Sequence, residues 1–85
     1  MPTIESRIRA FLGEQFQAPQ DLPAAESLLE GGIIDSIGVL TLVTWLEEAF
    51  GFLVDDEDVL PENLDGIGNL VAYVQRKLDE AAAAP

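Results

Sequence analysis

The sequence predicts a small all-α fold, a bundle of three main helices plus one short helix. Apolar residues recur at helical spacing in three segments, and residues that favour helix caps stand at the segment ends. No segment shows the strict alternation of a half-buried strand. Because 85 residues form one small domain, we expect a single unit with its core at about residues 3–79 and a frayed tail at 80–85.

The first predicted helix begins after Thr3, a suitable N-cap, and ends near Phe16. The stretch 17–34 contains prolines and glycines without a sustained period, so it is predicted to be a long loop that is anchored by apolar side chains. The residues that form the helix stripe and the loop anchors are Ile4, Ile8, Phe11, Leu12, Leu28 and Leu29.

The second predicted helix begins at Asp35-Ser36, runs to Phe50 and stops at Gly51. At 100° per residue, five of its apolar residues fall on one stripe and are expected to face the core. Trp45 is expected at the edge of the core, on the side opposite Ile37. The stripe consists of Val39, Leu42, Val43, Leu46 and Phe50.

The rest of the chain, after Gly51, is predicted to form an acidic connection, a short helix and a last helix. Asp55–Asp58 form the acidic connection, and Pro61 can open a helical turn that runs through Leu64. Asp65 is the expected N-cap of the last helix. The apolar face of that helix consists of Ile67, Leu70, Val71, Val74 and Leu78.

The charge distribution is strongly one-sided. Four Lys and Arg against sixteen Asp and Glu give a formal net charge of −12. Nucleic acids and anionic membranes are therefore excluded as ligands, because both require clustered positive charge. A partner with a basic docking surface fits this charge, although acids that only maintain solubility would give the same composition. The positive residues stand near the two ends of the chain, at Arg7, Arg9, Arg76 and Lys77.

The absence of cysteine and histidine excludes disulfides, thiolate nucleophiles, Cys/His metal sites and the usual general base. With no credible acid/base pair, an enzyme is not expected. The N-terminus has no signal-peptide pattern, and no apolar run approaches the ~20 residues that span a bilayer. We therefore expect a cytoplasmic protein without membrane insertion, and we also expect it to be a monomer.

A calcium-binding helix–loop–helix is a possible interpretation of the acids Asp55–Asp58, but the spacing is wrong for it. An EF-hand loop needs glycine at its sixth position and glutamate at its twelfth. A loop that starts at Asp56 has Pro61 and Ile67 there, and a loop that starts at Asp58 fails in the same way. We expect no metal site.

The candidate functional residue is Ser36, at the predicted start of the second helix. A helix N-terminus exposes free backbone N–H groups and the positive end of the helix dipole. A phosphodiester on Ser36 Oγ would be favoured there by about 0.3–1 kcal/mol. The plainer alternative is that Asp35 or Ser36 only caps the helix, which is the usual role of such residues.

The same helix has a flank outside the core stripe that combines apolar residues with acids. Such a face is typical of a docking surface, which needs apolar anchors as well as steering charge, although isolated exposed apolar residues are also normal. The candidate partner-binding residues are Ile37, Leu40, Thr41, Thr44, Glu47 and Glu48.

The order of these features resembles the phosphopantetheine-binding carrier proteins, namely acyl carrier protein and its peptidyl and D-alanyl relatives. The similarity covers nearly the whole chain: helix, long loop, Gly-x-x-Asp-Ser-Ile, a helix with Leu-Glu-Glu-x-Phe-Gly, acidic turn, short helix and last helix.

The resemblance implies that a phosphopantetheinyl transferase attaches 4'-phosphopantetheine from coenzyme A to Ser36. The thiol of the arm would hold acyl groups as thioesters for fatty acid, lipid or polyketide-type biosynthesis. It also implies that Asp35 takes part in transferase recognition. The helix from Ser36 to Phe50 would dock on basic patches of acyl-activating and acyl-transferring enzymes. A chain without cysteine fits, because the thiol arrives with the cofactor.

The sequence departs from the fatty-acid-synthesis members at two positions. Gly38 and Thr41 stand where those members usually carry acids, and Gly38 leaves the capping box with Asp35 incomplete, which predicts a loose helix start. Gly-Gly-Ile-Ile before Asp35 is closer to freestanding specialised carriers. An aminoacyl, peptidyl or D-alanyl carrier therefore stays open as an alternative, and an unmodified acidic helical adaptor is an alternative of a different class.

Overall fold

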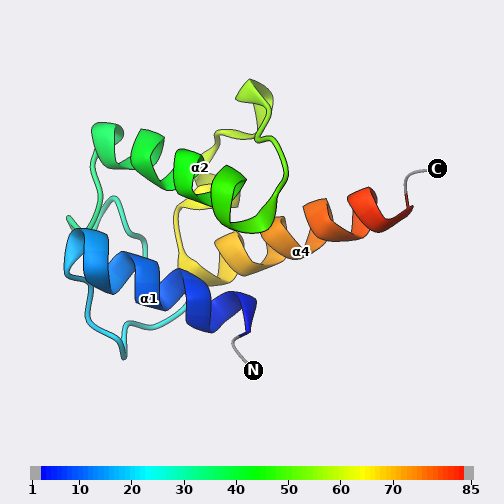
Figure 1. Ribbon diagram of the computed structural model, residues 1–85. Coiled ribbons are helices and arrows are strands. Elements are labelled where there is room, and N and C mark those ends of the chain that lie inside the picture. Colours follow the sequence, from blue (N-terminus) through cyan, green and yellow to red (C-terminus); the bar gives the residue numbers. More distant parts are fainter. Residues whose placement is uncertain (1–2, 84–85) are drawn as a thin grey trace.

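The computed structural model describes residues 3–83, and all regular structure within them is helical, which confirms the predicted fold class. Figure 1 shows α1, α2 and α4 gathered into a bundle, with α4 running beyond the other helices towards the C-terminus. Within residues 3–83, no helix is both long and apolar enough to cross a bilayer. The elements are α1 (Ile4–Phe16), α2 (Ser36–Phe50), the 3₁₀ helix η1 (Asp56–Asp58), α3 (Pro61–Leu64) and α4 (Ile67–Ala83).

α1 has the bounds that the sequence predicts, because its ends are defined locally. Thr3 is the N-cap and forms a capping box with Ser6: Ser6 N donates to Thr3 Oγ1 at 3.0 Å, and Thr3 N donates to Ser6 Oγ at 2.8 Å. The helix ends where Gln17 takes up the left-handed conformation at φ 60°.

α2 also has its predicted bounds. Asp35 is the N-cap, and Gly51 ends the helix at φ 75°, with its N–H donated to the Glu47 carbonyl at 3.0 Å. All five predicted stripe residues belong to the core or pack against it. The buried residues of α2, however, are Gly38, Leu42 and Leu46. The face that the helix turns to the core is therefore rotated from the predicted stripe towards Gly38.

The predicted N-cap role of Asp65 is wrong. α4 begins only at Ile67, and the Gly66 carbonyl accepts the N–H of Leu70 at 2.9 Å. Asp65 stands one residue too early, and its carboxylate accepts bonds from the 17–34 loop instead. The predicted apolar face of α4 packs in or against the core. Tyr73, which the predicted face did not include, is also buried in the core. α4 continues through Ala83, and residues 84–85 of the predicted tail lie outside the described residues.

The 17–34 loop is part of the core, although it contains no regular element. Leu22, Leu28 and Ile34 are buried, and Arg9 holds its first part by donating to the carbonyls of Gln20 at 3.1 Å and Leu22 at 2.7 Å. Leu28 is a loop anchor as predicted, with none of its surface exposed, but the same prediction for Leu29 is wrong. Leu29 is 39% exposed and lies beside a surface cavity described below.

Candidate functional site

Ser36 is the first residue of α2, and it is exposed. Asp35, directly before it, has an extended backbone, and its Oδ1 accepts the N–H of Gly38 at 2.7 Å. The Asp35 carbonyl accepts the N–H of Val39 at 3.0 Å, so the helix starts with a side-chain cap and a regular first bond. N–H groups of the first turn stand outside the helical ladder, as at any helix N-terminus, and here Asp35 accepts that of Gly38.

The segment before Asp35 is held in place by a tight turn. The Leu28 carbonyl accepts the N–H of Ile33 at 2.9 Å and that of Ile34 at 3.3 Å. Gly32 supplies the positive φ, 73°, that the turn requires, which side chains other than glycine rarely adopt. With Ile34 buried in the core, the exposed Asp35 and Ser36 follow directly from an anchored residue.

Gly38 leaves room for the Phe16 ring at the start of α2. A Cβ at this position would lie 3.1 Å from the Phe16 ring, 3.2 Å from Ile34 Cβ and 3.3 Å from Asp35 Oδ1. The position at which this chain has glycine instead of an acid is therefore one where a larger side chain would be crowded. The predicted loose helix start is not what the structure has, because Gly38 is buried and its N–H is capped by Asp35. A shallow hollow of about 300 Å³ lies beside the helix start, and its lining includes Phe16, Asp35 and Gly38.

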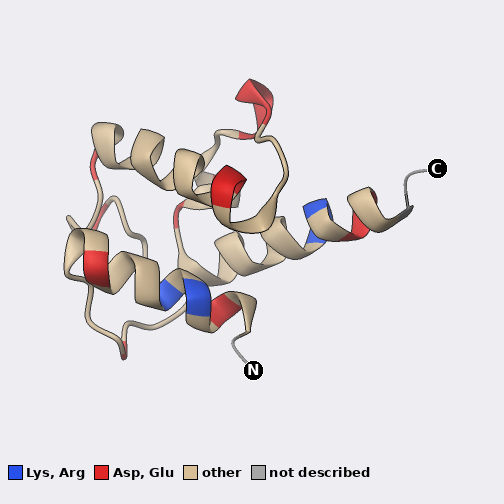
Figure 2. Ribbon diagram, in the orientation of Figure 1, with Lys and Arg blue, Asp and Glu red and all other residues tan. Residues whose placement is uncertain are grey.

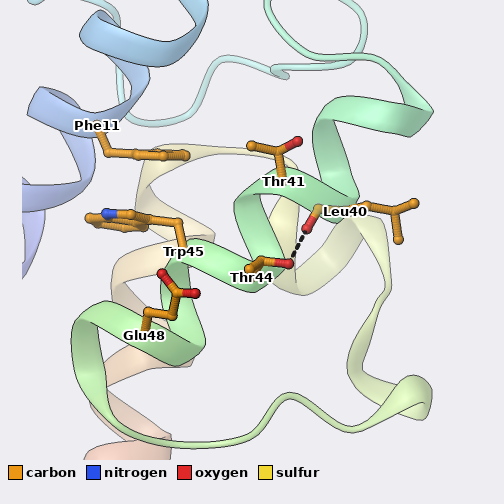
Figure 3. A pocket seen from close by; sticks show the side chains of 6 residues that line it. All are labelled: Phe11, Leu40, Thr41, Thr44, Trp45 and Glu48. Atoms are coloured by element: carbon orange, nitrogen blue, oxygen red, sulfur yellow. Dashed lines mark hydrogen bonds between the residues drawn. The ribbon is translucent and has the colours of Figure 1, made fainter.

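The predicted docking residues form one outward face of α2, which we call the α2 face. Ile37 is 75% exposed and Leu40 is 67% exposed. Thr44 is exposed too, and its hydroxyl donates to the Leu40 carbonyl at 3.0 Å (Figure 3). Of the remaining members, Glu48 is exposed, whereas Thr41 and Glu47 are half-buried.

An open hollow of about 420 Å³ borders the α2 face. Figure 3 shows the Phe11 ring from α1 lying over Trp45, and the two ring centroids are 4.3 Å apart. Trp45 is half-buried at the edge of the core, as predicted, but it shares this hollow with the α2 face instead of lying opposite it. Sequence reasoning missed Phe11 at this surface, because the contact joins two helices. The lining residues are Phe11, Leu40, Thr41, Thr44, Trp45 and Glu48.

The two acids of the α2 face are not equivalent. Glu47 Oε2 accepts the backbone N–H of Val54 at 2.8 Å, which ties the segment after Gly51 to α2. No sequence pattern signalled this bond. Glu48 lies on the rim of the hollow and is exposed. Of the two carboxylates, Glu48 is therefore the one available to an approaching partner.

Basic side chains lie away from the α2 face. Figure 2 shows Lys and Arg only on α1 and α4, while the charged residues of α2 are acidic. Arg7 donates to the Ala49 carbonyl at 2.9 Å and lies over the Phe50 ring at 4.3 Å, so it covers the C-terminal end of α2. Lys77 lies 3.8 Å from Asp55. A partner that approaches the Ser36 end of α2 therefore meets negative charge and exposed apolar side chains.

A smaller and more enclosed apolar cavity, of about 140 Å³, lies between α2, α3 and the 17–34 loop. Val39, one helical turn after Ser36, forms part of its wall, and the carboxylate-bearing Asp65 stands at its edge. We call it the α2–α3 cavity. Its other lining residues are Leu29, Val59, Leu60, Pro61 and Leu64.

Known proteins resemble this chain along most of its length. The family described as phosphopantetheine attachment site matches residues 6–74. The acyl carrier protein of Chlamydia trachomatis serovar D is 28% identical over 76 residues, which cover 88% of this chain and 96% of the relative. That of Renibacterium salmoninarum is 37% identical over 57 residues, covering 67% and 68%. The D-alanyl carrier protein of Abiotrophia defectiva is 31% identical over 52 residues, covering 61% and 66%.

The family match spans the helix that begins at Ser36 and the loop before it. The chain therefore belongs to the phosphopantetheine attachment-site family, and it is a carrier protein whose cofactor is 4'-phosphopantetheine.

Proposed function

We propose that Ser36 is the attachment residue and that the protein carries acyl groups as thioesters for acyl-transferring enzymes. One observation carries this proposal: Ser36 is the exposed first residue of a capped helix inside the family match. When bound, the arm supplies the thiol that the chain itself lacks. The chain's own residues fit a phosphodiester, because the helix N-terminus favours an anion at Ser36 by about 0.3–1 kcal/mol.

Asp35 supports the attachment by fixing the helix start. Its Oδ1 accepts the Gly38 N–H, which holds the carboxylate against the first turn of the helix that Ser36 begins. We infer that a phosphopantetheinyl transferase recognises this acid together with the α2 face. The exposed Ile37 and Leu40 would provide apolar contact, and Glu48 would steer a basic partner surface towards Ser36.

The cargo is inferred from the α2–α3 cavity. Its wall is formed mainly by aliphatic side chains, and Val39 places it one turn from Ser36. An acyl chain gains free energy when it leaves water for such a site, whereas the ammonium group of an aminoacyl cargo would lose its hydration there. The aminoacyl alternative has support of its own in the similarity to a D-alanyl carrier protein.

Intact-mass measurement tests the attachment residue. Wild type, Ser36→Ala and Ser6→Ala are incubated with coenzyme A and a broad-specificity phosphopantetheinyl transferase. We expect one phosphopantetheine on wild type and Ser6→Ala and none on Ser36→Ala. An unmodified wild type, or a modified Ser36→Ala protein, would leave the unmodified adaptor as the better interpretation.

The melting temperature of the loaded protein separates the two cargo classes. A chain that occupies the cavity stabilises the folded state, because it binds the folded protein and not the unfolded one. We expect the octanoyl form to have a higher melting temperature than the form with a free thiol. The D-alanyl form should have the same melting temperature as the form with a free thiol. A D-alanyl form that is stabilised as much as the octanoyl form would favour the aminoacyl alternative.

A further inference from the structure

Asp65 holds the 17–34 loop beside the α2–α3 cavity. Its Oδ2 accepts the Ser27 hydroxyl at 2.6 Å, and its Oδ1 accepts the Leu29 N–H at 2.8 Å. Ser27 Oγ in turn accepts the Glu30 N–H at 3.0 Å. We call Asp65, Ser27 and the Leu29 N–H the Asp65 clasp. It joins positions that are 36 and 38 residues apart in the sequence.

The clasp acts directly on one wall of the α2–α3 cavity. Leu29 lines the cavity with its side chain while its N–H is held by Asp65. The adjacent Leu28 is fully buried, so the chain is anchored immediately before Leu29. The 39% exposure of Leu29 places it between the cavity and solvent. The position of this wall therefore depends on the bonds that Asp65 accepts.

The part of the wall that Val59 forms is held differently. Asp58 stands next to Val59, and its Oδ2 accepts the hydroxyl of Tyr73 at 2.9 Å, while its carbonyl accepts Asn63 Nδ2 at the same distance. Tyr73 is only 1% exposed, so this wall is fastened to the core of α4. The Asp65 clasp, by contrast, is half-buried and joins a loop to the turn after α3. The loop wall is therefore the one that is easier to release.

The clasp carries charge at neutral pH. Burial raises the pKa of Asp65, but the bonds from Ser27, Leu29 and Leu28 outweigh it, and the pKa lies below its ordinary value. An ionised acceptor makes stronger hydrogen bonds than a neutral one, so removing the carboxylate weakens both bonds at once.

We propose that Asp65 is a positioning residue that closes the Leu29 wall of the α2–α3 cavity and so determines how well an acyl chain longer than acetyl is shielded. This inference rests on the proposed function, because it concerns the cargo of the same arm. It goes beyond that function by assigning the retention of long chains to the clasp. Beyond the thioester carbonyl an acetyl group offers the cavity only one methyl carbon, so its cleavage should depend little on the Leu29 wall and serves as the internal reference.

The test measures by intact mass how fast hydroxylamine cleaves acetyl and octanoyl thioesters on the thiol of the arm that is attached to Ser36. The variants are Asp65→Ala, Ser27→Ala and Leu29→Ala, with Asp65→Asn as the conservative substitution that retains one acceptor oxygen. We expect the octanoyl form of wild type to be cleaved more slowly than the acetyl form. Asp65→Ala should accelerate octanoyl cleavage about fivefold and leave acetyl cleavage unchanged. A roughly fivefold rise in the population with a released Leu29 wall corresponds to the loss of one net hydrogen bond.

Ser27→Ala and Asp65→Asn should fall between wild type and Asp65→Ala, and Leu29→Ala should open the wall without touching the clasp. Arg9→Gln is the matched control, because it releases the same loop at Gln20 and Leu22, away from the cavity. A purely structural role for Asp65 would change both thioesters alike, or make Arg9→Gln behave as Asp65→Ala does, and either result would overturn the proposal.

A second measurement does not depend on loading at Ser36. Free octanoyl-pantetheine is titrated into unmodified wild type and Asp65→Ala while the amide NMR signals of Leu29, Val39 and Leu64 are followed. We expect shifts in wild type and weaker binding in the variant. Absent shifts, or equal binding by both proteins, would refute the clasp proposal. A wild type that binds octanoyl-pantetheine but is never modified at Ser36 would instead refute the attachment proposal.

Discussion

The two faces of α2 carry the same kinds of residue in opposite environments. Leu42 and Leu46 on the inner face have no exposed surface, whereas Ile37 and Leu40 on the outer face are 75% and 67% exposed. The inner leucines pack with α1 and α4 in the core. The outer residues stand near the rim of open hollows, beside Thr44 and Glu48. Residue type alone therefore does not separate packing from recognition in this helix, but position on the helix does.

The difference implies that residues on the outer face can serve in recognition because they contribute little to the stability of the fold. Exposed aliphatic side chains contribute little to folding because folding leaves them largely in water. Two of them on one short face, next to a carboxylate and free of positive charge, provide both contact area and steering charge for a basic partner. The following predictions test this contrast, starting with the largest expected effect.

The inner face should respond to truncation much more strongly than the outer face. We expect Leu46→Ala to lower the free energy of unfolding by about 2–5 kcal/mol, since it leaves a cavity in a fully buried site. Leu40→Ala should stay within about 0.5 kcal/mol of wild type, yet be modified more slowly by the transferase. Urea denaturation and single-turnover modification rates measure the two effects. A Leu40→Ala protein that unfolds readily would show that Leu40 contributes to the core.

The N-cap of α2 should combine a moderate stability effect with a functional one. Removing the Asp35 bond to the Gly38 N–H by Asp35→Ala should destabilise the protein by about 1 kcal/mol and slow the modification of Ser36. Thr3→Ala is the matched control, because Thr3 caps α1 in the same way at a distance from Ser36. If Thr3→Ala slows modification as much as Asp35→Ala does, the effect comes from stability and not from recognition of the acid.

Features that depend on neighbours in the sequence were predictable. The start of α1 and both ends of α2 follow from Thr3, Asp35 and Gly51, whose capping bonds join residues three or four apart. The short helix at Pro61 follows from the same kind of local preference. The exposure of Ile37 and Leu40 followed from helical periodicity, whereas Thr41 and Glu47 of the same predicted face are half-buried.

Features that depend on tertiary contacts were not predictable. Asp65 is a good N-cap by type, but its carboxylate is engaged by Ser27 and Leu29, and nothing local signals that bond. Leu28 and Leu29 look alike in the sequence, and only the turn geometry decides which one enters the core. Likewise, the Phe11 ring reaches the α2 face only because α1 packs beside α2.

The Asp65 clasp predicts a pH dependence with a defined sign. Since the folded pKa of Asp65 is lowered, its ionised form contributes stability above the ordinary aspartate pKa of about 4, and this contribution is lost as the pH falls through the folded pKa. The free-energy difference between wild type and Asp65→Asn should therefore be largest near neutral pH and shrink below about pH 4. Urea titrations of both proteins at a series of pH values measure it. A difference that stays constant down to acidic pH would show that the charge on Asp65 does not support the clasp.

The smallest expected effects separate Glu47 from Glu48. Glu47→Gln keeps an acceptor oxygen but removes the charge from the bond to the Val54 N–H, so it should lower stability by about 0.5 kcal/mol. Glu48→Gln should leave stability unchanged, because this side chain is exposed on the rim of the hollow. Its effect should appear instead in the association rate with the transferase, mainly at low salt, because steering charges act on encounter and are screened as ionic strength rises. Stopped-flow association at low and high salt measures this. A Glu48→Gln protein that associates at the wild-type rate at low salt, while Glu47→Gln associates more slowly, would transfer the steering role to the carboxylate that the structure ties to Val54.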